Sequence, residues 1–338
     1  MIVQQTVDRE IVVSVLCLAY NHKPYIRACL DGMLGQKTDF RFEVIVHDDA
    51  STDGTAECIR AYAARYPDIV VPIYQSENQY SKDHGLLRNI VFPRARGRYF
   101  ALCDGDDCWL DAHKLQKQVE YMQMHPDCTL CFTNAQTSGR QCARMLPQKD
   151  RRTFYKAGGG DYSMGELVRL GTIPTSSLLF PAWAVHKLPP RNQNAYGGDT
   201  FLWLAAAALG YAHFLDEDTC LYRTDVPGSV TNAWQRDGDR HLRFQKRRLL
   251  LLDDMDRFSG YRYHNDVEAE KVLRGELMAR LLLFGSVSPK EQRLPENKVL
   301  VRQYIRTHGR RYLVPYALVR CLPHTVNCLR RLLGKRTF

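Results

Sequence analysis

The sequence predicts an α/β fold with a mostly parallel central sheet flanked by helices, followed by a helical, basic C-terminal region. Three observations lead to this prediction. Between residues 11 and 133, short β-rich apolar runs alternate with segments of helical periodicity. Several of these runs end in clusters of polar side chains, and from about residue 236 the pattern becomes helical and basic. Strands that alternate with helices at this spacing are typical of a parallel sheet covered by helices on both faces.

The strands of the first half are short apolar runs with turn residues at their ends. They are expected at residues 11–18, 42–46, 70–74, 99–103 and 129–133. A helix is expected after each of the first two strands and before the last one. The first helix should begin near Pro24, because proline is favourable at a first helical position. Its apolar face comprises Ile26, Cys29, Leu30 and Met33, and that of the third helix comprises Leu115, Val119 and Met122.

The second half is less regular. Residues 138–162 are polar and loop-like, a strand is expected at 173–180, and an Ala-rich stretch at 201–209 predicts a buried helix. We therefore expect one domain over residues 1–235 and a separate helical region over residues 236–338.

Composition excludes several classes of protein. Apolar residues make up 45% of the 338 residues and charged residues 25%, which is typical of globular rather than disordered chains. The apolar run at 201–209 is far shorter than the roughly 18–20 residues that span a bilayer, and the N-terminus shows no signal-peptide pattern. The eleven cysteines are an odd number, which favours free thiols in a reducing cytoplasm.

Metal sites built from Cys or His are not expected. Cys128 and Cys131 form a C-x-x-C pair, but the pair lies in a predicted strand and no second pair stands at zinc-ligand spacing. The histidines show no ligand-type pair either. Buried thiols are the favoured interpretation of the cysteines, with a structural-metal or redox role as the alternative.

Charge is distributed unevenly along the chain. Residues 240–338 carry 22 Lys or Arg against 9 Asp or Glu. Within this region, the residues after Glu296 include ten basic residues and no acidic one. Such a tail indicates a polyanionic partner, either a membrane surface or a nucleic acid. Leucines alternate with the basic residues, which favours attachment to an anionic membrane surface; a solvated basic subdomain is the alternative. Nucleic acid is not expected, because neither an aromatic stacking platform nor a helix-turn-helix is visible.

Three of the predicted strands end in distinctive polar clusters. These are Tyr20-Asn21, Asp48-Asp49 and Asp104-Gly105-Asp106-Asp107. Ligands of parallel α/β sheets bind at the carboxyl ends of the strands. We therefore expect all three clusters to open onto one crevice.

The acidic clusters suggest two kinds of chemistry. Three carboxylates within four residues at Asp104–Asp107 favour a hard divalent cation, Mg²⁺ or Mn²⁺, with places left for phosphate oxygens. A solvated turn in which Asp107 or Asp111 caps the next helix is the alternative. The Asp48-Asp49 pair can accept hydrogen bonds from a nucleotide base or ribose, while Ser51, Thr52 or Asp53 can cap the helix that follows.

Together these strings resemble the family 2 glycosyltransferases, in particular the bacterial branch that builds surface polysaccharides. The resemblance is carried by the segments VSVLCLAYNH, FEVIVHDDASTDGT and RARGRYFALCDGDDCW, which follow in the family's order. It implies a GT-A fold, with a nucleotide-sugar half at about 11–133 and an acceptor half at about 160–235. It also implies a metal-dependent enzyme of the hexosyltransferase type that inverts the anomeric carbon of its donor, most simply a UDP-sugar.

The resemblance assigns roles to individual residues. Ala19, Tyr20 and Asn21 would border the nucleotide base, and one of Asp48 and Asp49 would contact the base and ribose. Asp104 and Asp106 would bind the cation, Asp106 more directly. The remaining positions are Asp107 beside the donor sugar, Arg88 and Arg223 as donor contacts, and Asp199 as catalytic base, for which a helix N-cap is the alternative.

The implied acceptor is a glycan or a lipid-linked saccharide, which places the enzyme in the cytoplasm at the inner face of the cell membrane. Two other functions remain open from the sequence. One is a sugar-1-phosphate nucleotidyltransferase, although no glycine-rich loop follows the first strand. The other is a non-enzymatic, basic nucleic-acid-binding protein.

Overall fold

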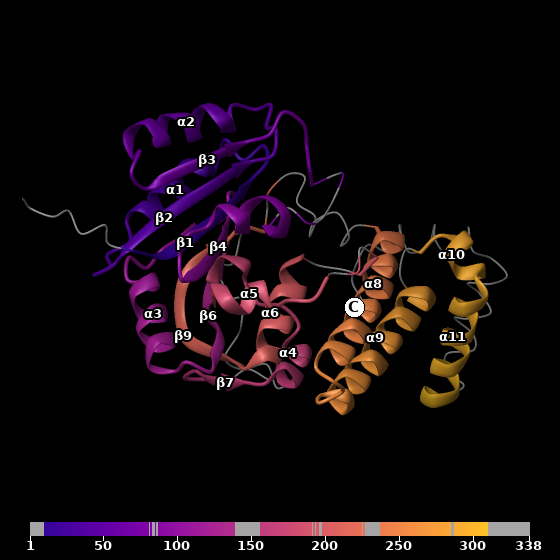
Figure 1. Ribbon diagram of the computed structural model, residues 1–338. Coiled ribbons are helices and arrows are strands. Elements are labelled where there is room, and N and C mark those ends of the chain that lie inside the picture. The colour runs from indigo at the N-terminus through magenta and orange to yellow at the C-terminus, as the bar shows by residue number, and fades with distance from the viewer. Residues whose placement is uncertain are drawn as a thin grey trace, which may run out of the picture. The chain divides into compact units, whose positions relative to one another are not determined.

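The computed structural model describes residues 10–80, 82, 85, 87–138, 156–190, 192, 194–195, 198–224, 226, 237–284 and 287–309 (Figure 1). The chain divides into two compact units. The first comprises Met1–Gln193, Gly197–Asp225 and Phe258–Gly260, and the second Asn194–Tyr196, Val226–Arg257 and Tyr261–Phe338. The expected domain boundary at residue 235 lies outside the described residues.

The first unit is built on one mixed sheet with the order β3-β2-β1-β4-β8-β6-β9-β5, to which β7 adds by pairing with β9. The long strands are β1 (Ile11–Ala19), β2 (Arg41–Asp48), β3 (Val70–Tyr74), β4 (Tyr99–Asp104), β6 (Cys128–Thr137) and β9 (Tyr211–Tyr222). The short strands are β5 (Cys108–Trp109), β7 (Gly160–Tyr162) and β8 (Leu179–Pro181). All pairs between long strands are parallel, and all pairs that involve a short strand are antiparallel. The predicted α/β class is therefore confirmed.

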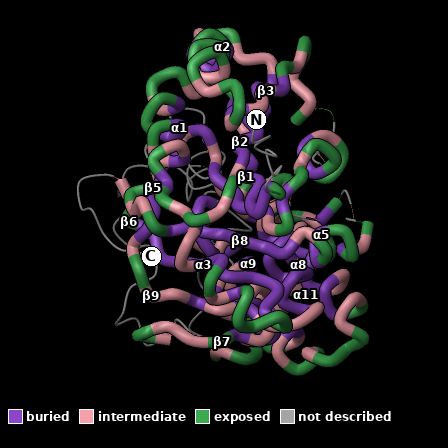
Figure 2. Tube along the Cα trace, turned by 60° about the vertical axis from the view of Figure 1, so that its left-hand side comes forward, coloured by how far each residue is buried: buried purple, intermediate pink, exposed green. Residues whose placement is uncertain are grey.

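Helices cover this sheet and complete its core. They are α1 (Ile26–Leu34), α2 (Thr55–Arg65), α3 (Lys114–Met124), α4 (Met164–Leu170), α5 (Ala182–His186) and α6 (Gly198–Leu209). The predicted apolar faces of α1 and α3 are buried, and they pack in one cluster with Val13, Val15 and Cys17 of β1 (Figure 2). Alternate residues of β1 thus share one face of the sheet, as the two-residue period of a strand requires.

The segment at 173–180 corrects one expectation. Instead of a continuous strand, it forms a 3₁₀ turn at Thr175–Ser177 followed by the three-residue strand β8. The Ser177 hydroxyl donates a hydrogen bond of 2.7 Å to the Pro174 carbonyl and closes the turn. Hydroxyl side chains that bond to nearby backbone compete with strand pairing in this way.

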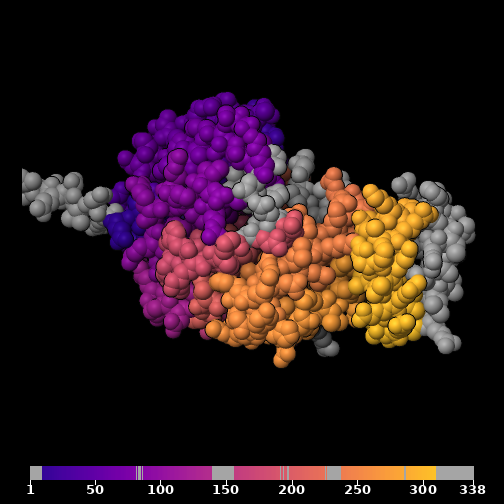
Figure 3. Space-filling view, turned by 45° about the vertical axis from the view of Figure 1, so that its right-hand side comes forward, coloured from indigo at the N-terminus to yellow at the C-terminus, as the bar shows by residue number. Residues whose placement is uncertain are grey.

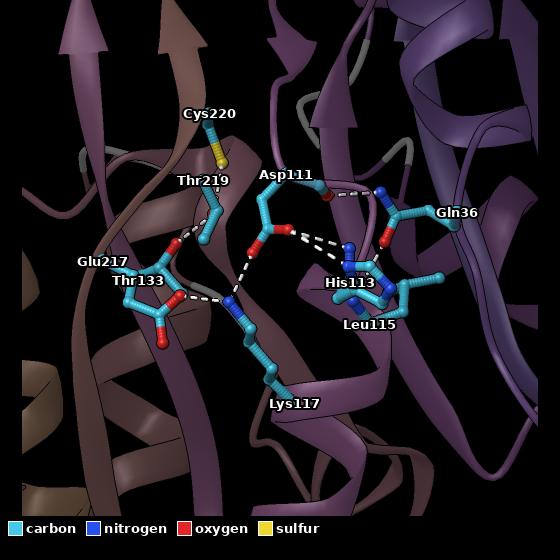
Figure 4. A network of polar contacts seen from close by, with 9 residues as sticks. All are labelled: Gln36, Asp111, His113, Leu115, Lys117, Thr133, Glu217, Thr219 and Cys220. Carbon is cyan, nitrogen blue, oxygen red and sulfur yellow. Dashed lines mark hydrogen bonds and ion pairs between the residues drawn. The ribbon is translucent and has the colours of Figure 1, made fainter.

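Helix α3 is tied to the end of the sheet by a polar network. Lys117 forms ion pairs with Asp111 and with Glu217 of β9, while the side chain of Gln36 accepts a hydrogen bond from the Leu115 backbone N–H (3.0 Å) (Figure 4). These contacts hold in place helix α3, the helix that follows the acidic cluster at the end of β4.

The second unit is helical. It comprises α8 (Gly238–Phe258), α9 (His264–Phe284), α10 (Pro289–Arg293) and α11 (Pro295–His308), and α10 and α11 form the yellow surface in Figure 3. Its core includes Leu242 of α8, Met278 and Leu282 of α9, and Val301 and Tyr304 of α11. The expected helical C-terminal region is confirmed up to His308, whereas the acid-free sequence beyond Gly309 lies outside the described residues. Among the described helices, none is both long and apolar enough to cross a bilayer.

The cysteines in the described residues are all buried and free. They include Cys128 and Cys131 of the C-x-x-C pair, which lie in β6 as expected. The interpretation of buried thiols is confirmed for this part of the chain.

Candidate active site

The three polar clusters lie at one edge of the sheet. Strands β2, β1 and β4 are neighbours and run parallel, so their carboxyl ends meet. The Asn21 backbone N–H donates to the Ser51 hydroxyl (2.9 Å), and the Thr52 N–H donates to the Asn21 side-chain oxygen (2.8 Å). The Gly105 N–H donates to the Leu18 carbonyl (2.8 Å). The loop after β1 is thus bonded to the loop after β2, and the turn after β4 is bonded to the end of β1.

Two of these loops contain a strained backbone. Asn21 has φ 56° and Ala50 has φ 61°, both in the left-handed region that residues other than glycine rarely occupy. Such conformations cost about 1–3 kcal/mol each and are concentrated at functional sites. The backbone at the end of β1 and β2 is bent at a cost in stability.

Asp48 and Asp49 are both buried but do different things. The Asp49 carboxylate accepts backbone N–H groups from Gln79 (2.7 Å) and Tyr80 (3.0 Å), which holds the segment after β3. Asp48 accepts the Ser51 N–H with one oxygen (3.2 Å), and its other oxygen is buried without a hydrogen-bond partner among the described residues. Asp48 therefore retains an acceptor that a ligand can use.

The carboxylates of the Asp104–Asp107 turn repel one another in a region of low solvent access. Desolvation, then the charges of Asp106, Asp107 and Asp199, raise the pKa of Asp104 well above its usual range. Desolvation, then Asp106, raises the pKa of Asp107 to about 7. The Arg223 backbone N–H donates to Asp107 (2.9 Å), whose other carboxylate oxygen is buried without a hydrogen-bond partner among the described residues. Crowded carboxylates with raised pKa values are typical of sites that bind cations or move protons.

These side chains suit a hard divalent cation in their chemistry. Oxygen donors are the ligands that Mg²⁺ and Mn²⁺ prefer, and Mg²⁺ is usually held by one or two carboxylates together with the phosphates of a substrate. Among the described residues, no group of three or more His, Cys, Asp or Glu side chains is arranged to hold a metal ion without a ligand. The carboxylates of Asp104 and Asp106 are oxygen donors of the type that such a cation prefers.

Asp199 reaches the same edge of the sheet from helix α6. Its negative charge is the last of the causes that raise the pKa of Asp104, after desolvation and the charges of Asp106 and Asp107. The Thr175 hydroxyl donates to an Asp199 oxygen at 3.4 Å, a long hydrogen bond. Helix α6 begins at Gly198, so Asp199 lies in its first turn, and the alternative role as an N-cap is wrong.

The two predicted arginines bind backbone carbonyls. Arg223 donates to the Asp106 carbonyl (2.5 Å), and its guanidinium lies over the Tyr25 ring at 5.2 Å. Arg88 donates to the carbonyls of Pro189 (2.7 Å) and Leu188 (3.3 Å). Arg223 thus shapes the acidic turn itself, and Arg88 shapes a neighbouring loop.

The expected helix caps are also corrected. The N-cap of α2 is Gly54, without a side-chain cap, although Asp53 accepts hydrogen bonds from the backbone and hydroxyl of Thr55 (2.9 and 2.6 Å). The N-cap of α3 is His113, so neither Asp107 nor Asp111 occupies that position. Asp107 is therefore not needed for capping.

His22 belongs to this site and was not among the expected residues. Its Nε2 atom lies 3.9 Å from an Asp106 carboxylate oxygen. Burial lowers the pKa of His22, although the charges of Asp106, Asp53 and Asp48 oppose the shift. Two signals in the sequence point to it: it directly follows the Tyr20-Asn21 cluster, and it ends the segment VSVLCLAYNH.

Comparison with known sequences identifies relatives of this chain. Residues 14–163 match the family model described as Glycosyl transferase family 2. The uncharacterized protein Rv1520 of Mycobacterium tuberculosis is 36% identical over 226 residues, and the match covers 65% of this chain and 61% of that protein. The putative teichuronic acid biosynthesis glycosyltransferase TuaG of Bacillus subtilis is 36% identical over 121 residues, which cover 36% of this chain and 45% of that protein.

Comparison with solved structures supports the fold. The structure of residues 1–349 of S. aureus TarS in complex with UDP-GlcNAc has a TM-score of 0.64 at 17% sequence identity, and the match covers 97% of this chain and 94% of that one. With the family match over the strands that carry the acidic clusters, this likeness confirms the expected GT-A fold. Residues 14–163 therefore form a domain of Glycosyl transferase family 2.

Proposed function

We propose that this protein is an inverting, metal-dependent glycosyltransferase of the hexosyltransferase type that moves a sugar from a nucleotide-diphosphate donor, a UDP-sugar, to an acceptor hydroxyl. The observation that carries the proposal is that Asp199 is linked by hydrogen bonds to the segment after the Asp104–Asp107 turn. The Thr175 hydroxyl donates to Asp199, and the carbonyl of the next residue, Ser176, accepts a hydrogen bond from the Trp109 indole (2.8 Å), two residues after Asp107. A base for the acceptor and ligands for the donor thus converge, although they come from distant parts of the chain.

Asp199 is proposed as the general base. A sugar hydroxyl is a weak nucleophile near neutral pH, and a carboxylate that takes its proton as the new bond forms lowers the barrier. The hydroxyl oxygen attacks the anomeric carbon, and the bond from that carbon to the diphosphate oxygen breaks. The Thr175 hydroxyl donates to Asp199. This contact helps to orient the carboxylate toward the acceptor.

Asp104 and Asp106 would hold a Mn²⁺ or Mg²⁺ ion. When bound, such an ion supplies positive charge that stabilises the departing diphosphate. Asp107, held by the Arg223 backbone N–H, would lie beside the donor sugar. Ala19, Tyr20, Asn21 and the Asp48-Asp49 pair would border the base and ribose, with Arg88 and Arg223 as further donor contacts.

The wider role is also a proposal. The chain spans 61% of the length of its mycobacterial relatives. The printed name of TuaG supports polysaccharide biosynthesis as the process, and the UDP-GlcNAc complex of TarS supports a UDP-sugar as donor. We further propose residues 1–235 as the catalytic domain, and residues 236–338 as a basic region that attaches to an anionic membrane surface at the inner face of the cell membrane. A glycan or lipid-linked acceptor would meet the enzyme there.

The test is the variant Asp199→Asn. We expect it to retain affinity for UDP in the presence of Mn²⁺ but to lose at least about 100-fold in transfer, since general-base catalysis contributes about 10²–10⁴-fold. Asp68→Asn, an exposed carboxylate, is the control and should transfer normally. Full transfer by Asp199→Asn would remove Asp199 as the base. Release of pyrophosphate from a nucleoside triphosphate would instead indicate a nucleotidyltransferase.

A further inference from the structure

His22 belongs to the loop after β1, and its imidazole packs against the acidic turn after β4. Its Nε2 atom is 3.9 Å from an Asp106 oxygen, which is too long for a hydrogen bond. The side chain of His22 is 18% exposed, so part of it remains open to solvent. Nothing in the proposed role of Asp106 requires a histidine at this place.

The other ring nitrogen of His22 is enclosed. Nδ1 is buried and has no hydrogen-bond partner among the described residues. It faces Gly105, where an added Cβ would lie 2.9 Å from Nδ1. The absence of a side chain at Gly105 is therefore what allows the imidazole to pack against the turn.

This environment fixes the position of the ring hydrogen. A buried N–H group without an acceptor is costly, whereas a lone pair in the same place is tolerated better. In the neutral ring Nδ1 therefore carries the lone pair and Nε2 carries the hydrogen. A protonated ring carries a hydrogen on Nε2 as well. In both states Nε2–H is a donor directed toward the site.

We propose that His22 binds the diphosphate of the donor, with Nε2–H donating a hydrogen bond to a phosphate oxygen beside Asp106. The inference rests on the proposed function, because it places the diphosphate at Asp106. Direct coordination of the cation by Nε2 is disfavoured, since it would move the hydrogen to the enclosed Nδ1. A fixed donor at this place also stabilises the negative charge that grows on the diphosphate as it leaves.

The test compares His22→Leu, which removes the donor, with His22→Gln, whose amide nitrogen can replace Nε2–H. His113→Leu, at an exposed histidine outside the site, is the matched control. Calorimetry in Mn²⁺ first identifies which of UDP, GDP, CDP, ADP and dTDP binds the wild type. Affinities of all variants are then measured for that diphosphate and for its nucleoside. Equal melting temperatures show that the variants are folded.

We expect His22→Leu to lose about 10- to 100-fold in affinity for the diphosphate, the effect of one hydrogen bond to a charged group, with less than a twofold change for the nucleoside. His22→Gln should stay within about fivefold of the wild type. Equal binding of the diphosphate by His22→Leu and wild type overturns the inference and leaves the proposed function standing. The inference is also overturned if His22→Leu loses equal affinity for the nucleoside and the diphosphate, or if it loses Mn²⁺ binding in the absence of nucleotide. A wild type that binds none of the five diphosphates overturns the proposed function, and this inference with it.

Discussion

Individual carboxylates of the site are held at a cost in stability. The pKa of Asp107 is about 7 in the folded chain and 3.8 as its ordinary value. The folded state therefore holds the proton more tightly than the unfolded state. Below about pH 3.8 both states are protonated and there is no penalty. As the pH rises from there through about 7, the free energy of unfolding falls, by roughly 4 kcal/mol at most.

The variant Asp107→Asn should remove this dependence. Without metal, we expect its melting temperature to fall less than that of the wild type between pH 5 and pH 8, because no carboxyl has to ionise at that position. The asparagine oxygen can still accept the Arg223 N–H. Thermal unfolding at several pH values measures the difference, with Asp68→Asn as the control. Parallel curves for Asp107→Asn and wild type would contradict the assigned pKa shift.

Glycine 105 shows how a single residue determines the fit between two elements. A Cβ at Gly105 would lie 2.9 Å from His22 Nδ1, 3.1 Å from the Ala19 Cβ and 3.2 Å from the Leu18 carbonyl oxygen. Backbone and a buried ring cannot all move aside. We expect Gly105→Ala to lower the free energy of unfolding by about 1–3 kcal/mol, the usual cost of overpacking.

Urea denaturation measures this loss through a shift of the midpoint at constant slope. Gly198→Ala is the matched control, because a Cβ at the first residue of α6 meets no atom within 4 Å. It should change the free energy of unfolding by less than about 1 kcal/mol. If both alanine variants were equally stable, the loop after β1 would be more adaptable than the contacts indicate.

At the scale of elements, the sequence predicts regular segments better than interrupted ones. Strands β1 to β4 and helices α1 and α3 are found where expected, because each has an uninterrupted apolar pattern. Strand β9 was missed. Its pairing with β6 shifts register at Thr133–Asn134 and Asn134–Ala135, and irregularities of this kind break the two-residue period.

The site shows the same division. The clusters after β1, β2 and β4 are predictable together, because parallel neighbouring strands place their carboxyl ends at one edge. The position of Asp199 relative to the acidic turn cannot be predicted from the local sequence pattern, because it depends on how helix α6 packs. His22 was overlooked since its role depends on the contact with Gly105, which no spacing in the sequence displays. The positions of Asp199 and His22 in the site are therefore determined by tertiary contacts, which the strand pattern does not reveal.

At the scale of the whole molecule, the catalytic residues and the excess positive charge belong to different parts of the chain. The proposed catalytic residues lie before residue 225, and residues 240–338 carry 22 basic against 9 acidic residues. On α11, Val299 is 61% exposed, and Arg302 and Arg306 are exposed on the same face of the helix. An exposed apolar side chain next to basic ones on the same helix face suits the surface of an anionic bilayer.

This arrangement predicts salt-sensitive binding of the full chain to vesicles. The chain should sediment with vesicles that contain phosphatidylglycerol at about 0.05 M salt, but not with pure phosphatidylcholine and not at about 1 M salt, where the Debye length falls to about 3 Å. Each basic residue near an anionic surface contributes about 1 kcal/mol, so the double variant Arg302→Ala/Arg306→Ala should bind roughly 30-fold more weakly. Arg27→Ala/Lys37→Ala removes two exposed charges from the first unit and should bind like the wild type. Equal weakening by both pairs would mean that net charge alone, rather than the face of α11, determines attachment.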